Sequence, residues 1–225
     1  MNRIALSGTL AAAFIALASA RDAAIADAPA SLPTSRAAYQ VRFQLSDGSD
    51  AWPADKREAI IAAIEPAVAL YNEVGEFDKL VTVNYSPSTP TADANYDGWI
   101  NFGKQIGKRT ALHELGHCMG IGTVPRWREL IVDGKWTGEH ALSQLRAFDG
   151  PDAVLYADRQ HFWPYGLNFD KESSPENDRR HVMMVMAFRK DLGIKNGEPQ
   201  PERRRRRDAA TQPKIVEPTT ARGAG

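Results

Sequence analysis

Apolar and polar positions alternate along residues 39–45, a period of two that predicts a half-buried strand. Residues 53–74 instead repeat apolar positions about every 3.6 residues, which predicts a helix that Pro66 kinks or splits. Apolar runs over 80–85 and 98–103 predict two further strands. A loop rich in Ser, Pro and Thr is expected between these two strands.

The second part of the pattern is mostly helical. We expect helices over 107–119, 138–148 and 179–192, the first and last of them with an apolar face. Strands and one helix therefore precede a helical part, and we predict an α+β fold. It has a small twisted mixed sheet with a backing helix and a mostly helical C-terminal subdomain. The other expected elements are a hairpin over 130–136, a short helix over 152–158 and an aromatic loop over 160–169.

Both ends of the chain differ in composition from its middle. Residues 1–20 combine a basic start, an apolar run and a small-x-small cleavage site, which predicts a signal peptide and export to a periplasm or the medium. Residues 21–36 are expected to be a flexible lead-in, and 198–225 a disordered basic, Pro-rich tail. The run Arg203–Arg207 either does nothing specific or tethers the protein to an acidic partner. The folded domain is then 37–197.

Charge and cysteine content narrow the classes of function. The chain has 28 basic and 28 acidic residues, so nothing in its net charge points to nucleic acid or an anionic membrane as partner. Outside the signal peptide no segment is apolar enough to span a bilayer. Cys118 is the only cysteine, which excludes an intramolecular disulfide. We expect a monomer.

One motif indicates a chemical function. The segment His113-Glu114-Leu-Gly-His117 lies on the expected helix 107–119 and has the form HExxH. Four residues on a helix bring both imidazoles to one face, where they suit one Zn²⁺ ion. Glu114 can then serve as general base toward a water on that ion. This is the signature of the zincin metallopeptidases, so the domain is predicted to be a zincin-like catalytic domain.

A catalytic zinc ion usually has a third protein ligand. Metzincins carry it as a histidine three residues after a glycine, but the chain has Thr123 there, which is a poor ligand. We prefer His161, because it enters an aromatic loop with a Pro and a Gly shortly after it. His140 and a carboxylate such as Asp170 or Glu172 stay open as alternatives.

Residues 111–193 resemble the leishmanolysin-type metzincins, in which the third histidine arrives after a long insertion. In place of the methionine turn of metzincins this chain has Tyr165-Gly166-Leu167-Asn168, where Leu167 would supply the apolar floor. The resemblance implies a zinc peptidase with His113, His117 and His161 as ligands. Besides the HExxHxxG helix it rests on Gly122-Thr123 with Trp127, Gly150-Pro151-Asp152-Ala153, His161 with Trp163, and Asp191-Leu192-Gly193.

The expected function is that of an exported zinc endopeptidase acting on peptides or proteins, with Glu114 as general base. Tyr165 would add a hydrogen bond to the oxyanion, and Trp99–Phe102 would form the upper cleft edge that pairs with an extended peptide. One alternative is a zinc hydrolase of a cell-wall or glycan-linked amide. Another is a non-catalytic zinc-binding module, against which the intact Glu114 argues, since structural zinc needs no base.

Overall fold

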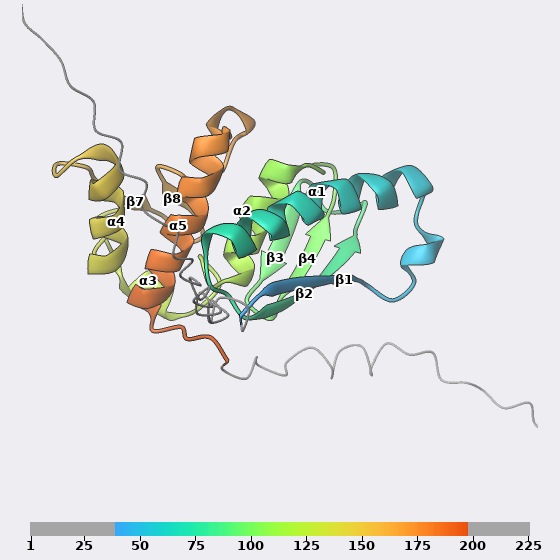
Figure 1. Cartoon of the computed structure of the whole chain (residues 1–225), viewed down its shortest axis with the longest axis horizontal. Coiled ribbons are helices and arrows are strands. Elements are labelled where there is room, and N and C mark those ends of the chain that lie inside the picture. The colour runs from blue at the N-terminus through green and yellow to red at the C-terminus, as the bar shows by residue number, and fades with distance from the viewer. Residues whose placement is uncertain (1–38, 198–225) are drawn as a thin grey trace, which may run out of the picture. The chain divides into compact units, whose positions relative to one another are not determined.

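The computed structural model describes residues 39–197, and the predicted signal peptide, lead-in and basic tail lie outside them. Within this range the chain forms five α-helices and eight strands in two small sheets, a mixed α+β arrangement (Figure 1). In chain order the elements are β1 (Val41–Leu45), η2 (Ser49–Ala51), α1 (Ala54–Val74), β2 (Lys79–Tyr85), β3 (Ala92–Asn95), β4 (Trp99–Phe102), α2 (Lys108–Cys118), α3 (Arg126–Glu129), β5 (Ile131–Val132), β6 (Lys135–Trp136), α4 (Glu139–Asp149), β7 (Tyr156–Ala157), β8 (Phe162–Trp163), η3 (Asp170–Glu172) and α5 (Pro175–Leu192).

The first sheet has the strand order β1-β2-β4-β3. Strands β1, β2 and β4 are parallel, and β3 runs antiparallel to β4 at the edge, with Ala94 opposite Ile100. Parallel neighbours need a crossover connection, which α1 supplies between β1 and β2. The α+β class is therefore confirmed, with a small mixed sheet that α1 backs.

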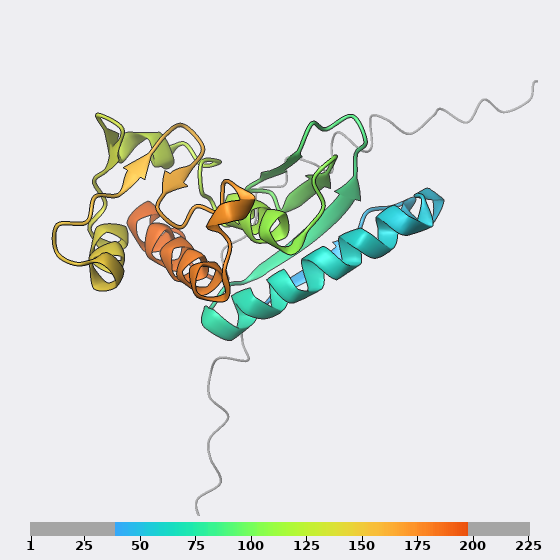
Figure 2. The same ribbon diagram turned by 90° about the horizontal axis from the view of Figure 1, so that it is seen from above.

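Helices α1 and α2 pack on one face of this sheet. Val81, Val83, Ile100 and Phe102 are fully buried, whereas Leu80, one position along β2, is largely exposed. This alternation is the mark of a sheet covered on one side. Figure 2 shows α1 running lengthwise along the strands. The sheet therefore forms a rigid base against which α2 is held.

Aromatic side chains build the core of the second half. The ring of Trp136 lies 4.6 Å from that of Trp127 and 4.8 Å from that of Phe188 on α5, centroid to centroid. Phe162 on β8 packs on Phe188 at 4.6 Å. Figure 1 shows α5 lying between α4 and the first half of the domain. Helix α5 therefore joins both halves through its buried face.

Asp191, near the end of α5, caps the start of α4. Its carboxylate accepts hydrogen bonds from the backbone N–H groups of His140 (2.8 Å) and Ala141 (3.0 Å) and from the indole N–H of Trp136 (3.0 Å). The first N–H groups of a helix have no partner inside it, and a carboxylate also complements the helix dipole. A side chain at Gly138 would clash with this carboxylate, which explains the glycine.

We expect Asp191→Ala to lower the free energy of unfolding by about 2 kcal/mol, because three donors lose their acceptor. Asp191→Asn keeps one acceptor oxygen and should lose less. Urea denaturation of the two variants and the parent chain measures this difference. Equal stabilities for the parent and Asp191→Ala would show that the cap contributes nothing.

Most predicted elements are confirmed: β1, α1, β2, β4, α2, the β5–β6 hairpin and α4 lie where the pattern places them. Helix α1 runs through Pro66 and is not split. Helix α5 begins at Pro175, earlier than the predicted 179, because the Ser174 side chain accepts a hydrogen bond from the backbone N–H of Asn177.

The secondary structure predicted for two segments was wrong. The loop expected before residue 98 contains β3, whose Ala-Asp-Ala-Asn sequence has low strand propensity and is extended only because it pairs with β4. The helix expected over 152–158 is a turn followed by β7, which pairs with β8 inside the aromatic loop. The second half is therefore less helical than predicted, since β5 to β8 form a sheet of their own.

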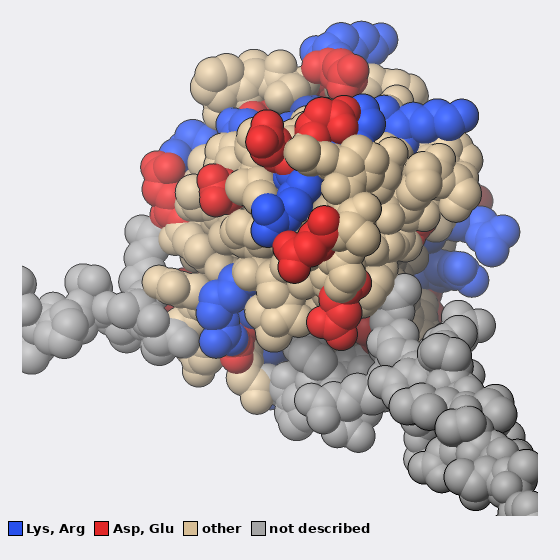
Figure 3. Space-filling model, turned by 90° about the vertical axis from the view of Figure 1, so that its right-hand side faces the viewer, with Lys and Arg blue, Asp and Glu red and all other residues tan. Residues whose placement is uncertain are grey.

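The described surface mixes charges of both signs. Figure 3 shows Lys and Arg interspersed with Asp and Glu on one face, as the balanced composition leads one to expect. Among residues 39–197, no helix combines the length and the apolar character needed to cross a bilayer.

Candidate metal centre

Helix α2 positions the HExxH residues at the bottom of a cleft. His113 and His117 lie one turn apart with ring centroids separated by 4.7 Å. Together with Glu114 they line a cavity of about 560 Å³, which is bounded by β3 on one side and by the segment 158–169 on the other. The motif thus faces open space rather than the core.

Two backbone carbonyls fix the orientation of these rings. Nδ1 of His113 lies 2.8 Å from the carbonyl oxygen of Gly166, and Nδ1 of His117 lies 2.8 Å from that of Ile121. A carbonyl can only accept, so each Nδ1 must carry the proton. Both Nε2 atoms are then bare lone pairs. Such outer contacts are typical of metal-ligating histidines.

His161 completes a cluster with these two rings. It lies between β7 and β8, and its backbone N–H donates to the Asp158 carboxylate at 2.6 Å. Its Nδ1 lies 3.4 Å from the same carboxylate oxygen. One ligand atom from each of the three histidines lies within 4.8 Å of the others. The structure therefore brings together the three histidines that the sequence analysis selected.

This donor set fits zinc. The Nε2 atoms of His113 and His117 face each other at 3.1 Å, and two lone pairs at that distance repel unless a cation lies between them. Tetrahedral zinc with Zn–N bonds of about 2.0–2.1 Å separates its ligand nitrogens by roughly 3.3 Å. Burial, followed by the field of His117, holds the pKa of His113 well below its usual value, and burial lowers the pKa of His117 to about 4. Neutral imidazoles are the form that binds a metal.

Glu114 is 5 % exposed, and its Oε2 has no hydrogen-bond partner within the described part of the chain. Burial, aided by nearby Asp93 and opposed by Arg109, raises the pKa of its carboxyl group to about 8. A buried polar atom without a hydrogen-bond partner is costly, and strongly shifted pKa values gather at functional sites. Glu114 lines the same cavity as the three clustered histidines.

The edge of the cleft is β3, which corrects the prediction that Trp99–Phe102 forms it. The predicted residues are β4, which lies inside the sheet between β2 and β3. Thr91, Ala92, Asp93 and Ala94 line the cavity instead. Within residues 39–197, β3 pairs with no strand on its outer side.

Tyr165 is not placed to contact a substrate carbonyl. Its hydroxyl group donates to Asp149 at 2.6 Å and accepts from Arg180, and its ring packs on Phe148. It is not among the residues that line the cavity. We therefore withdraw the role predicted for Tyr165 at the oxyanion, because its polar atom is bound on another side of the turn.

The other candidate ligands have different partners. His140 is exposed at the start of α4, Asp170 pairs with Arg109, and Glu172 accepts the backbone N–H of Asn168 at 2.7 Å. None belongs to the histidine cluster. Thr123 donates its hydroxyl proton to the His117 carbonyl at 2.7 Å, so it bonds to the C-terminal end of α2.

Cys118 follows His117 but faces the core. One residue turns a helix by about 100°, which takes this side chain off the metal face. It is fully buried, and this burial raises the pKa of its thiol to about 12. Cys118 is thus a small apolar residue of the core, as expected from the sequence.

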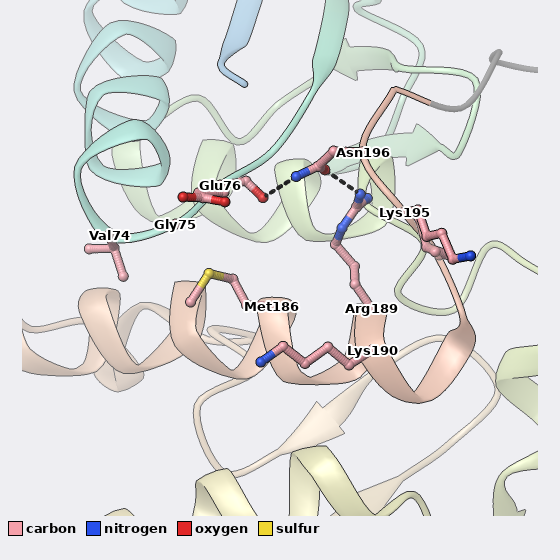
Figure 4. A pocket seen from close by; sticks show the side chains of 9 residues that line it. Val74, Gly75, Glu76, Met186, Arg189, Lys190, Lys195 and Asn196 are labelled. Atoms are coloured by element: carbon pink, nitrogen blue, oxygen red, sulfur yellow. Dashed lines mark hydrogen bonds between the residues drawn. The ribbon is translucent and has the colours of Figure 1, made fainter. Parts of the chain in front are cut away.

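A second cavity, of about 600 Å³, lies where α1 and α5 end (Figure 4). Asn196 spans it: its amide nitrogen donates to the Glu76 carbonyl at 3.0 Å, and its oxygen accepts from Arg189 at 2.9 Å. These bonds fasten the segment after α5 to the loop after α1. No residue of the histidine cluster lines this cavity.

Sequence reasoning missed the supporting contacts of the site. Asp158 could have been suspected, because an Asp three residues before a candidate ligand can bond to its backbone. The carbonyls of Gly166 and Ile121 carry no signal, since every residue has such a group. The cleft edge β3 was hidden by its weak strand propensity.

Comparisons with protein-family models, curated proteins and solved structures found no match to this chain.

Proposed function

We propose that this protein is an exported zinc-dependent metallopeptidase with a zincin-like catalytic domain. One observation carries the proposal: three histidine nitrogens converge in a cleft beside a buried glutamate whose Oε2 has no partner within the described range. A site that only stabilises the fold would not need that glutamate, which burial penalises. Export is inferred from the signal peptide pattern of residues 1–20.

The residues fall into simple roles. His113, His117 and His161 would hold the metal through Nε2, with Gly166, Ile121 and Asp158 keeping the rings in place. When bound, Zn²⁺ supplies Lewis acidity toward the scissile carbonyl and lowers the pKa of water. Glu114 accepts the proton of the attacking water and passes it to the peptide nitrogen. The nitrogen can then leave as a neutral amine and not as an amide anion, which is a poor leaving group.

A peptide substrate fits the shape of the cleft. The outer side of β3 pairs with no strand within residues 39–197, so its backbone N–H and C=O groups can pair with an extended chain, and Ala92 and Ala94 line the cavity with small side chains. Phe169, 57 % exposed, and Trp163 lie on the opposite wall, where they can contact apolar substrate side chains. These features favour an extended polypeptide over a small amide.

Removal and return of the metal test the proposal. The zinc-loaded protein should cleave a permanently unfolded protein substrate, and 1,10-phenanthroline should abolish cleavage. After the chelator is removed by dialysis, one equivalent of Zn²⁺ should restore cleavage. The 1,7 isomer of phenanthroline, which cannot chelate, is the matched control. If the zinc-loaded protein leaves unfolded proteins and peptides intact but opens amides in cell-wall fragments, the peptidase proposal is wrong.

A further inference from the structure

Three successive carbonyls in the turn below the histidine cluster each accept a side-chain donor. The Tyr165 carbonyl accepts from Nδ1 of His181 at 2.8 Å, that of Gly166 from Nδ1 of His113 at 2.8 Å, and that of Leu167 from Arg109 at 3.3 Å. Arg109 and His113 belong to α2, and His181 to α5. The turn 165–167 is thus held from two helices.

This turn needs such support because its backbone is strained. Tyr165 has φ 66° and Leu167 φ 55°, in the left-handed region that costs a side-chain-bearing residue roughly 1–2 kcal/mol. Between them, a side chain on Gly166 would clash with the Phe162 carbonyl and with Asn168. A strained turn persists only where its surroundings determine it, and such turns gather at functional sites.

His181 is the most deeply buried of the groups that hold the turn. It is 1 % exposed, and its ring stacks on Phe162 at 5.8 Å. Its Nδ1 must carry a proton, since the Tyr165 carbonyl can only accept. Its Nε2 lies 3.0 Å from the Leu112 carbonyl and 3.2 Å from the Tyr71 hydroxyl.

These contacts enclose His113 from two directions. Leu112 directly precedes His113 on α2, and Tyr165 directly precedes Gly166, whose carbonyl sets the His113 ring. His181 itself lies outside the ligand cluster. His181 therefore contacts the backbone just before His113 and the backbone just before Gly166, and it does not reach the metal position.

We propose that His181 is a positioning residue of the metal centre, which acts through the Tyr165 carbonyl on the turn that orients His113. The inference rests on the proposed metal site, although not on the reaction catalysed there. Deletion of the Nδ1–H donor frees the turn to relax, and His113 then loses its fixed orientation. Loss of an outer partner of a ligand typically weakens metal binding about 10–100-fold.

Two amide variants separate this role from core packing. In His181→Asn the amide nitrogen takes the place of Nδ1 and keeps the bond to Tyr165. In His181→Gln the amide group takes the place of Nε2 near the Leu112 carbonyl and leaves the Tyr165 carbonyl without its donor. Both lose the ring that stacks on Phe162, so both should show a similar fall in Tm. Zinc affinity, measured by competition with a chromophoric chelator, should fall about 10–100-fold in His181→Gln and within about threefold in His181→Asn.

Tyr71→Phe is the matched control, because it alters the same buried cluster and leaves the Tyr165 contact intact; its zinc affinity should equal that of the parent. Equal affinities for the two amide variants would overturn the proposal. So would a loss in Tyr71→Phe as large as that in His181→Gln. Since the readout is zinc binding, a parent chain that binds zinc but cleaves nothing refutes the peptidase function alone.

A measurement on the unaltered chain tests the proposal even if the variants do not fold. Coupling between two sites is reciprocal, so a turn that strengthens zinc binding must itself be strengthened by zinc. Exchange of the His181 Nδ1 proton with solvent, followed by NMR, should therefore slow at least tenfold when zinc is added. An unchanged exchange rate would contradict the coupling.

Discussion

Glu114→Gln should lower peptide cleavage by about 10²–10⁴-fold and leave the zinc content at one ion per chain. The amide has nearly the same size as the carboxylate but cannot accept the proton of the attacking water. Because Glu114 is not one of the clustered histidines, zinc should remain bound. The amide also removes a buried ionisable group, so the variant should be at least as stable as the parent.

The effect is measured as kcat/KM on an unfolded protein substrate, with metal content determined on the same samples. Glu139→Gln on α4, which is exposed and outside the cleft, is the matched control and should keep full activity. If Glu114→Gln retains activity within about threefold, another group acts as the base. If the variant loses its zinc, Glu114 is needed for metal binding, and the loss of activity says nothing about its role as a base.

His161→Ala should weaken zinc binding by at least about 100-fold, which is more than the loss of an outer partner causes. Removal of one of three ligands leaves only the two histidines on α2, and a chelator can remove zinc from such a site. His140→Ala is the control, since that exposed residue lies outside the cluster and its variant should bind zinc like the parent.

Equilibrium dialysis against a zinc buffer gives both affinities. Unchanged binding in His161→Ala would sink the assignment of the third ligand. The carboxylate alternatives are then tested in the same way with Asp170→Asn and Glu172→Gln. Their contacts with Arg109 and with Asn168 lead us to expect no change.

The part of the site that lies within one turn of helix could be predicted from the sequence. His113 and His117 are spaced by a helical turn, so their common face follows from local geometry alone. His161 was selected by its aromatic surroundings, yet the helix expected before it is a turn and a short strand. His161 nevertheless lies close to His113 and His117, although the local structure expected around it was wrong.

Contacts made by tertiary pairing could not be predicted. Strand β3 owes its conformation to β4, and an Ala-Asp-Ala-Asn segment has no alternation that marks a strand. The turn 165–167 was located, but as an apolar floor, and its carbonyl contacts are invisible in side-chain identity. His181 belongs to none of the sequence motifs, and its contact with the turn depends on how α5 packs.

The buried thiol of Cys118 has a consequence for all these experiments. A thiol reacts as its thiolate and only when a reagent reaches it, and this one is enclosed in the core with a pKa of about 12. As the sole cysteine, it can be alkylated only after the domain opens around α2. The chain therefore carries its own reporter of unfolding, which separates a variant with a damaged site from one with a damaged fold.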